Sequence, residues 1–376
     1  MGSPTVAGIG EHAVLERIRQ RVPSGASGVV VGIGDDAAVV EPDRGALTVV
    51  TTDALVEGIH FDRAFSSPAD AGHKALAANL SDLAAMGAMP RQALLSLSIP
   101  AACPVADIDA LIDALLALAT RHRTTLVGGD VTGSPGPLVI GVTALGSARR
   151  RRVLRRDGAR PGDIVYVSGT IGAAAAGLAA LRARSDGQPP APVAAGFAAD
   201  APDDPVAPDL SPPGTGAATG TGAGFGADLD ECVERHRRPE PRVALGVALG
   251  RNRAARTCID LSDGLSDAVG QLAAASGAGV RIDAEALPIH AGARAWFDAA
   301  GVDPVAAAVA GGEDYELAFT SPPAFRGRLR HVRKQIGSLP ITPIGVVTKE
   351  REVRLRRDGK DEPLPHGYQH FAAGEP

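Results

Sequence analysis

The chain has 376 residues, enough for two ordinary domains, because a single hydrophobic core usually stops growing at about 250 to 300 residues. Apolar residues make up 45% of it but aromatic residues only 3%, so the core must be built from Ala, Val, Leu and Ile. The formal net charge of -5 gives no basic footprint, which argues against nucleic acid as a partner.

Three apolar runs in the first half end in carboxylates. We expect buried strands in GVVVGIGDD, ALTVVTTD and TTLVGGD, which end at Asp36, Asp53 and Asp130. A helix is predicted to open with the Ser-Ser-Pro sequence that ends at Pro68, because Ser caps helices and Pro suits the first turn. A second helix is predicted over residues 105–122.

A domain boundary is expected near residue 150, where an arginine-rich stretch precedes a new strand at 164–167. We predict an N-terminal α/β domain over residues 1–150 and a C-terminal α/β domain over 151–376. Within the second domain, residues 184–226 consist of proline and glycine tracts without apolar periodicity. Such a composition cannot bury enough surface to offset its ordering entropy, so we expect a disordered insertion.

After the insertion, a strand is predicted over 257–261 and a helix that begins at Ser262 or Asp263. The motif GGEDYELAFT then turns from glycines into another strand. The three cysteines are widely separated and odd in number, which suits neither a disulfide framework nor a zinc site. Without a membrane-length apolar run or a signal-peptide pattern, the protein is expected in the cytoplasm, away from membranes.

Acidic residues gather where these strands are expected to end, and one more lies on the first long helix. That helix places Lys74, Ala78 and Asp82 on one face, at i, i+4 spacing. Mg²⁺ prefers such oxygen donors and usually joins one or two carboxylates to substrate phosphates. The acids and the neighbouring hydroxyl groups are Asp36, Thr51, Thr52, Asp53, Asp82, Asp130, Asp260, Ser262 and Asp263.

Each acid alone also has a structural interpretation. Asp263 could cap its helix, and for Asp35 and Asp314 a turn or cap explains the residue at least as well as metal binding. The whole set is harder to explain in this way, because like charges brought together repel unless a cation neutralises them. The set therefore predicts a site for Mg²⁺ and a polyphosphate.

Candidate phosphate donors are few. No G-x-x-x-x-G-K-[ST] motif occurs, so the chain is not a P-loop enzyme. Gly128 and Gly129 would let the backbone approach a phosphate, and Arg156 offers a planar donor, whereas residues 149–152 suit a solvated surface. His60 could bind substrate, although a lone histidine is about as often a packing or hydrogen-bonding residue.

Seven motifs, taken in order, resemble the series found in the thiamine-monophosphate kinase family: GIGDD, TTDALVEGIHF, NLSDLAAMGA, LVGGD, RDGARPGD, IDLSDGLSD and GGEDYELAF. That family lies in the superfamily of aminoimidazole ribonucleotide synthetase, with selenophosphate synthetase and a hydrogenase-maturation protein. The match spans nearly the whole chain except about 184–226. It implies a two-domain α/β fold of that superfamily with mixed sheets, and a homodimer joined through the N-terminal domains.

The resemblance also implies an activity, direct Mg²⁺-assisted transfer of the γ-phosphoryl group of ATP to thiamine monophosphate, giving thiamine diphosphate. The implied catalytic acids are Asp53, Asp82 and Asp130. The implied ligands of several Mg²⁺ ions are Asp36, Thr51, Thr52, Asp53, Asp82, Asp130, Asp260 and Asp263. ATP would be held by Gly129, Asp130, Arg156 and Ser262, and thiamine monophosphate by His60, Glu313 and Tyr368.

Two alternatives stay open. The chain could be another ATP-using member of the superfamily, acting on an aminoimidazole precursor or on selenide, although no Cys precedes Cys103, where selenophosphate synthetases usually carry a reactive residue. It could instead be a catalytically silent nucleotide-binding protein, although every expected acid is present.

Overall fold

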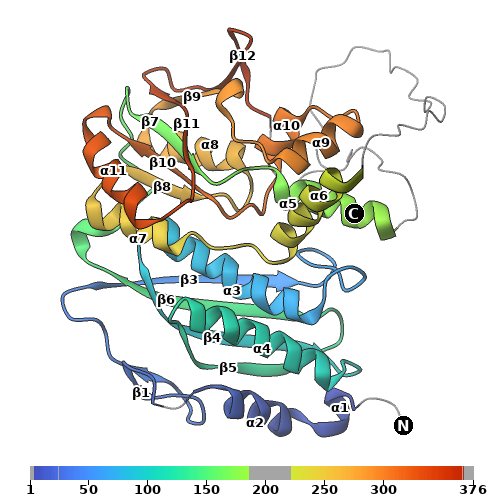
Figure 1. The fold of residues 1–376 in the computed structure, drawn as a ribbon. Helices are drawn as coiled ribbons and strands as arrows, with labels where there is room; N and C mark the ends of the chain where they lie inside the picture. The colour runs from blue at the N-terminus through green and yellow to red at the C-terminus, as the bar shows by residue number, and fades with distance from the viewer. Residues whose placement is uncertain (1–3, 24, 186–221, 366, 368–376) are drawn as a thin grey trace, which may run out of the picture.

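The computed structural model describes residues 4–23, 25–185, 222–365 and 367 (Figure 1). Helices and strands alternate along most of the chain and form two main sheets, one above the other in Figure 1, with helices between them. The predicted α/β class with mixed sheets is therefore confirmed. No helix in these residues is both long and apolar enough to cross a membrane.

The lower half contains a four-stranded sheet in the order β3-β6-β4-β5. β4 and β5 are parallel, and the other neighbours are antiparallel. Its strands are β3 (Leu47–Val56), β4 (Met89–Pro100), β5 (Thr125–Ser134) and β6 (Val139–Ala148). The other elements of this half are α1 (Val6–Ile9), α2 (Glu11–Arg21), β1 (Val29–Val31), β2 (Val39–Val40), α3 (Pro68–Ala85), α4 (Val105–Arg121) and η1 (Arg150–Arg152).

One face of this sheet is covered by α3 and α4 (Figure 1), and on the other face, called the open face below, the described residues leave β3 exposed. On β6, residues with even numbers such as Ile140 and Val142 are buried, whereas the intervening ones are only half-buried. On the edge strand β3, Val50 is 61% exposed on the open face. This face thus carries apolar surface that none of the described residues covers.

The upper half contains a seven-stranded sheet in the order β13-β12-β9-β11-β7-β10-β8. All its pairings are antiparallel except that of β12 with β9. Its strands are β7 (Ile164–Ser168), β8 (Thr257–Asp260), β9 (Gly279–Asp283), β10 (Leu317–Ser321), β11 (Ile341–Thr348), β12 (Val353–Arg357) and β13 (Lys360–Pro363). Its helices are α5 (Ala173–Ser185), α6 (Gly222–Arg237), α7 (Val243–Asn252), α8 (Leu265–Ser276), η2 (Ala284–Ala286), α9 (Ala291–Ala299), α10 (Pro304–Ala310), η3 (Pro323–Phe325) and α11 (Arg326–Gln335).

The helix α3 begins as its sequence predicts. Ser67 caps it by accepting a hydrogen bond from the backbone N of Asp70, whose side chain accepts in return from the backbone N of Ser67. Pro68 occupies the first turn. Beyond Met86, which ends the helix, Gly87 adopts the left-handed conformation at φ +65° that glycine tolerates.

Helix α3 lies between the two sheets and is closely packed on two sides. A Cβ added to Gly72 would lie 2.1 Å from the carbonyl oxygen of Leu111 on α4. A Cβ added to Gly246 on α7 would lie 1.9 Å from the carbonyl oxygen of Ala84 on α3. Only glycine therefore allows these backbones to approach so closely. One hydrophobic cluster continues from this half into α7 and β10 of the other.

Four predicted boundaries differ from those of the structure. Helix α5 continues to Ser185 and α6 begins at Gly222, so both helices enter the segment predicted as insertion; residues 186–221 lie outside the described residues. Strands β3 and β5 run three and four residues past Asp53 and Asp130, which lie within strands rather than at their ends. Pairing with β6 and β4 continues beyond these acids and keeps the backbone extended.

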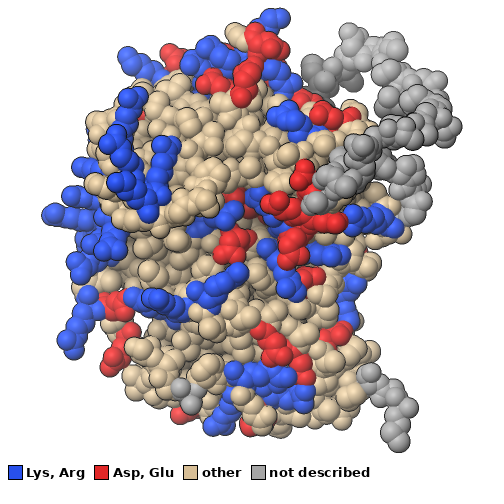
Figure 2. Space-filling model, in the orientation of Figure 1, with Lys and Arg blue, Asp and Glu red and all other residues tan. Residues whose placement is uncertain are grey.

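The arginine-rich stretch forms the short helix η1, and its residues are mostly exposed, as predicted for a solvated surface. Figure 2 shows lysine and arginine side chains gathered along the side of the molecule where α11 lies in Figure 1. Helix α11 has the sequence RGRLRHVRKQ, without an acidic residue.

Candidate active site

Where α3 passes between the two sheets, Asp82 interacts with two other predicted acids, Asp53 and Asp260. Asp53 comes from β3, Asp82 from the last turns of α3, and Asp260 from the end of β8. The Oγ1 of Thr51 donates to Asp82, and the Oγ of Ser81 donates to Oδ2 of Asp260 at 2.7 Å. We call Asp53, Asp82 and Asp260 the acid cluster.

The acid cluster is electrostatically strained without a cation. Burial raises the pKa of Asp53, and repulsion from Asp82 and a hydrogen bond with it raise that pKa further. Burial also raises the pKa of Asp82, a shift that the hydrogen bond from Thr51 and the charge of Arg156 partly offset. Burial and repulsion from Asp82 likewise raise the pKa of Asp260. A bound cation would favour the charged form of each carboxylate and so lower its pKa.

The loop between β8 and α8 carries two more predicted residues beside the cluster. The Oγ of Ser262 lies 3.5 Å from Oδ2 of Asp263, whose charge adds to the repulsion on Asp53. Helix α8 begins at Leu265 and is capped by Gly264, so Asp263 does not cap it. Arg156 is exposed; its Nη1 contacts Gln271, and its charge lowers the pKa of both Asp82 and Asp260.

The oxygen donors of the acid cluster fit a Mg²⁺ ion that takes only part of its ligands from the protein. Within the described residues, no three His, Cys, Asp or Glu side chains converge as a ready cage for a metal ion. The cluster instead offers carboxylates singly or in pairs, with the Thr51 hydroxyl beside Asp82. Mg²⁺ in proteins usually takes one or two carboxylates and completes its shell with water and substrate phosphates. The residues present therefore fit a Mg²⁺ ion that arrives with a nucleotide.

Two predicted residues, Gly129 and Asp130, lie on the far edge of the sheet, and the loop that follows a third, Asp36, passes close to them. Asp130 is exposed on β5, directly after Gly129. A Cβ added to Gly129 would lie 1.8 Å from the carbonyl oxygen of Leu95, so only glycine fits there. The loop after Asp36 passes close to β5, because a Cβ added to Gly128 would lie 4.0 Å from that of Ala38. Asp36, Gly129 and Asp130 are called the edge group below.

The sheet separates the edge group from the acid cluster. Asp130 lies opposite Ser96 on β4, and Ser96 lies opposite Gly141 on β6. Gly141 in turn lies opposite Ala54 on β3, the residue next to Asp53. Because side chains alternate along a strand, Asp53 and Asp130 point to opposite faces. They also lie on the two outer strands, about 14 Å apart at three strand spacings. The single chain thus does not bring these two predicted catalytic acids together.

Thr52 lies apart from both groups. Its side chain points to the open face of the sheet, where its Oγ1 lies 2.9 Å from Oγ1 of Thr143 and 3.1 Å from the carbonyl oxygen of Val142. Thr51, in contrast, points toward α3 and reaches Asp82. Of the two threonines predicted as ligands, the structure places only Thr51 beside the acid cluster.

The predicted substrate residues His60 and Glu313 are connected through the N-terminal half of α3. The Nζ of Lys74 lies 2.6 Å from Oε1 of Glu313 and donates to the carbonyl oxygen of His60 at 2.9 Å. The Nδ1 of His236, on α6, lies 3.0 Å from Oε2 of Glu313. Burial alone would raise the pKa of Glu313, but Lys74 and His236 lower it to about 2. Tyr368 lies outside the described residues.

The turn that carries Glu313 is fixed on both sides. Glu313 and Tyr315 adopt positive φ values of 67° and 49°, unusual for residues with side chains. Asp314 accepts hydrogen bonds from the backbone N atoms of Gly172 and Ala174, at 2.6 and 3.1 Å. These bonds hold the start of α5 and give Asp314 a structural role.

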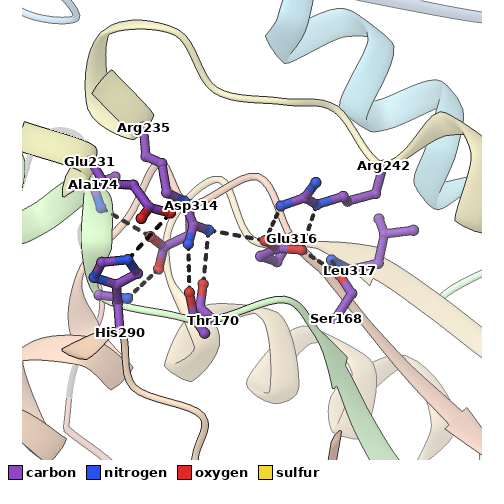
Figure 3. Close-up of polar contacts among 11 residues, drawn as sticks. Ser168, Thr170, Ala174, Glu231, Arg235, Arg242, His290, Asp314, Glu316 and Leu317 are labelled. Carbon is purple, nitrogen blue, oxygen red and sulfur yellow. Dashed lines mark hydrogen bonds and ion pairs between the residues drawn. The ribbon is translucent and has the colours of Figure 1, made fainter. Parts of the chain in front are cut away.

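Glu316, fully buried, closes the other side of the turn. Figure 3 shows Arg235 and Arg242 reaching it from two sides, with Nη2 of Arg235 at 2.9 Å and Nε of Arg242 at 2.7 Å. The Oγ of Ser168 donates to Oε2 of Glu316 at 2.6 Å. A buried carboxylate held by two guanidinium groups is strongly fixed, because its removal would leave two neighbouring positive charges without a counter-charge.

Sequence patterns did not identify Lys74, His236 or Ser81 as parts of this region. The available signal for Lys74 was a charged residue within an alanine-rich helix, eight positions before Asp82. For His236 and Ser81 there was no signal, because their partners are 77 and 179 positions away in the chain.

One cysteine has a basic neighbour that the sequence did not reveal. The Sγ of Cys232 lies 3.3 Å from Nδ1 of His290, which also accepts from the backbone N of Gly292 and so caps α9. Burial raises the pKa of Cys232 to about 12. The thiol is fully buried and protonated, so the pair has a packing role.

Comparison with known proteins gives three consistent findings. The family model described as AIR synthase related protein, N-terminal domain, matches residues 34–148. A thiamine-monophosphate kinase of Escherichia coli is 38% identical over 370 residues, covering 96% of this chain and 98% of that protein. A crystal structure of thiamine-monophosphate kinase from Stenotrophomonas maltophilia matches with a TM-score of 0.73 at 36% identity, covering 94% of this chain and 98% of that one.

A further solved structure contains bound molecules. AaThiL complexed with AMPPCP and TMP matches with a TM-score of 0.68 at 29% identity. The match covers 96% of this chain and 97% of that one.

Proposed function

The chain belongs to the thiamine-monophosphate kinase family, and from this premise we propose that it transfers the γ-phosphoryl group of ATP to thiamine monophosphate with the help of Mg²⁺. The observation that carries the proposal is the position of Asp82 beside Asp53 and Asp260: the three carboxylates come from separate elements, Asp260 is buried and the other two are half-buried, and Asp82 repels both neighbours. Such a cluster is costly unless it holds a cation.

The reaction needs little from a general base. An oxygen of the acceptor phosphate, already ionised near neutral pH, attacks the γ-phosphorus while the bond from that phosphorus to the β–γ bridging oxygen breaks. Thiamine diphosphate and ADP result. Bound Mg²⁺ would neutralise charge on the phosphates and on the reacting oxygens. The protein contributes mainly by holding two polyanions in line.

Different residues of the chain would bind the metal, the nucleotide and the acceptor. The acid cluster offers carboxylate oxygens to the metal–phosphate complex, and Arg156 offers a cation close to Asp82 and Asp260. Ser262 and Asp263 face the nucleotide from the β8–α8 loop. We place the acceptor's rings toward His60 and Glu313, which leaves its phosphate on the side of the acid cluster.

We propose a homodimer in which the edge group of one chain meets the acid cluster of the other. This arrangement would reconcile the roles expected of Asp53 and Asp130, which one chain holds on opposite faces of its sheet. The open sheet face with exposed Val50 offers apolar surface for the contact. Cyclic dimers use the same patch twice, so each of two equivalent sites would combine both chains.

A charge introduced on the open face tests this dimer. We expect Val50→Glu to convert the dimer to monomers and to abolish most of the activity, because a buried carboxylate at the interface lacks a partner. Light scattering coupled to size exclusion measures the mass, and ADP release measures the activity. Val50→Thr, of similar shape and without charge, should stay dimeric. A fully active Val50→Glu monomer would contradict the proposal.

Mg²⁺ should stabilise the protein, and one substitution should remove most of this stabilisation. We expect Asp82→Asn to raise the melting temperature of the metal-free protein by about 2 °C, because it removes repulsion with Asp53 and Asp260. The same change should remove most of the increase caused by Mg²⁺ with an ATP analogue. Differential scanning fluorimetry with EDTA and with MgCl₂ measures both effects.

Asp70→Asn on the same helix is the matched control. The Asp70 carboxylate pairs with Arg238 and caps α3, so the neutral variant should melt lower in EDTA. Its response to Mg²⁺ should stay normal. If both variants respond to Mg²⁺ like the wild type, the acid cluster is not the metal site.

The activity itself is tested by mixing the protein with ATP, Mg²⁺ and thiamine monophosphate and following ADP and thiamine diphosphate together. Equal formation of the two products supports direct transfer. Binding without turnover would favour a silent nucleotide-binding protein. Turnover of only an aminoimidazole precursor or selenide would redirect the assignment within the superfamily.

A further inference from the structure

The acceptor end of the site contains a buried charged group that the proposed reaction does not yet use. Lys74 is only 3% exposed, although it lies on an alanine-rich helix with few polar neighbours. Burial of an ammonium group is costly unless it is paired and hydrogen-bonded. Lys74 meets both conditions by contacting the Glu313 carboxylate and the His60 carbonyl.

These contacts join three segments that are distant in the sequence. Lys74 belongs to α3, His60 to the loop after β3, and Glu313 to the turn before β10. His236 adds α6 by approaching the other carboxylate oxygen of Glu313 at 3.0 Å. The side chain of Glu313 remains about a quarter exposed, so it is held in place and still accessible to a ligand.

The same turn also contacts the loop of the acid cluster. The backbone N of Glu313 donates to the carbonyl oxygen of Ser262 at 2.6 Å. A Cβ added to Gly312 would lie 2.6 Å from that same oxygen, so the two loops are in close contact. The left-handed conformation of Glu313 therefore persists only while its side chain and backbone are both anchored.

Helix α3 sets the distance between the two ends of the site. Lys74 and Asp82 are eight residues apart, which corresponds to about 12 Å along a helix and to the same face. Thiamine monophosphate has its phosphate at one end and its pyrimidine ring at the other. A single rigid helix can thus hold both the phosphate-binding and the ring-binding groups.

We propose that Lys74 and His236 are positioning residues for the acceptor: they hold the Glu313 carboxylate and the His60 loop in the arrangement that binds the rings of thiamine monophosphate. Neither residue touches the reacting oxygens. The inference rests on the proposed function and adds two residues to it. Its signature is a loss of acceptor affinity with nucleotide affinity retained.

The test is Lys74→Met, which keeps the side-chain length and removes the charge. We expect the KM for thiamine monophosphate to rise about tenfold, equivalent to about 1.4 kcal/mol. The KM for ATP should change less than about twofold, which is well below the tenfold rise expected for thiamine monophosphate. Calorimetric titration with thiamine monophosphate and, separately, with an ATP analogue and Mg²⁺ gives the same comparison without turnover.

Two further variants, a double variant and His236→Leu, distinguish a positioning role of Lys74 from a general loss of structure. If Lys74 acts through Glu313, then adding Lys74→Met to Glu313→Gln should raise the acceptor KM little further, because the contact is already weakened. His236→Leu, which removes the contact from another helix, should shift the acceptor KM in the same direction. His236→Leu also tests the inference if Lys74→Met fails to fold.

Arg256→Met is the control for the loss of a buried ion pair. Arg256 lies 2.7 Å from the buried carboxylate of Asp163, just before β8 and at the opposite end of that strand from Asp260. This variant should lower stability and leave both KM values unchanged. The inference would be overturned if Lys74→Met lost acceptor and nucleotide affinity equally. It would also be overturned if the rise in acceptor KM in the double variant with Glu313→Gln equalled the product of the two single rises. No turnover by the wild type would refute the proposed function instead.

Discussion

Asp53→Asn is expected to lower kcat by at least about 100-fold while the protein stays folded. The substitution preserves the shape of a side chain that is half-buried between β3 and α3, and it removes the negative charge. Because repulsion from Asp82 and burial both disfavour that charge in the metal-free protein, the neutral variant should be at least as stable as the wild type. The loss of kcat thus comes from weaker stabilisation of the metal–phosphate complex in the transition state.

Steady-state rates at saturating Mg²⁺, together with thermal melting, measure the two expected effects. Asp43→Asn is the matched control in the same half of the molecule. Its carboxylate contacts Arg91 and Ser147, away from the acid cluster, and its loss should leave kcat unchanged. A near-normal rate for Asp53→Asn at saturating Mg²⁺ would contradict the metal assignment.

Asp130→Asn should cause a loss of similar size, about 100-fold or more, although this acid is exposed and about 14 Å from Asp53. The proposed dimer explains why: the acid completes a site on the other chain. Mixed dimers of Asp53→Asn and Asp130→Asn then contain one site with both changes and one site with neither. We expect such heterodimers to regain about half of the wild-type activity.

Co-expression with two different affinity tags yields these heterodimers, and each parent homodimer serves as the inactive reference. Activity near that of the parents would place both acids in one chain's site and refute the composite arrangement. The experiment also distinguishes a structural role of Asp130, because a misfolded partner would not restore activity to the other chain.

Much of the fold could be predicted because its signals are local. The start of α3 follows from Ser67 and Pro68, and the extent of α4 from its apolar spacing. Strand ends were harder. The residues after Asp53 and Asp130 look like turns by composition, yet pairing with neighbouring strands keeps them extended. Register, which depends on contacts far along the chain, decided those boundaries.

The site was predictable as a list of residues but not as an arrangement. The sequence predicted one converging set of acids, and the structure places Asp82 of that set beside Asp53 and Asp260, although Asp53 lies within β3 rather than at its end. That Asp130 lies on the opposite face depends on the strand order and on the alternation of side chains, and neither can be obtained from motif spacing. The contact of Lys74 with Glu313 spans 239 positions and gave no local signal.

The glycine contacts of α3 have a consequence for the conformational cycle of the enzyme. With backbones pressed together at Gly72 and at Gly246, sliding or hinging between the two sheets would open gaps or create clashes. We therefore expect substrates to enter and leave without the halves swinging apart. Any motion that admits nucleotide should be confined to loops around the site, and the orientation of the two sheets should stay the same throughout turnover.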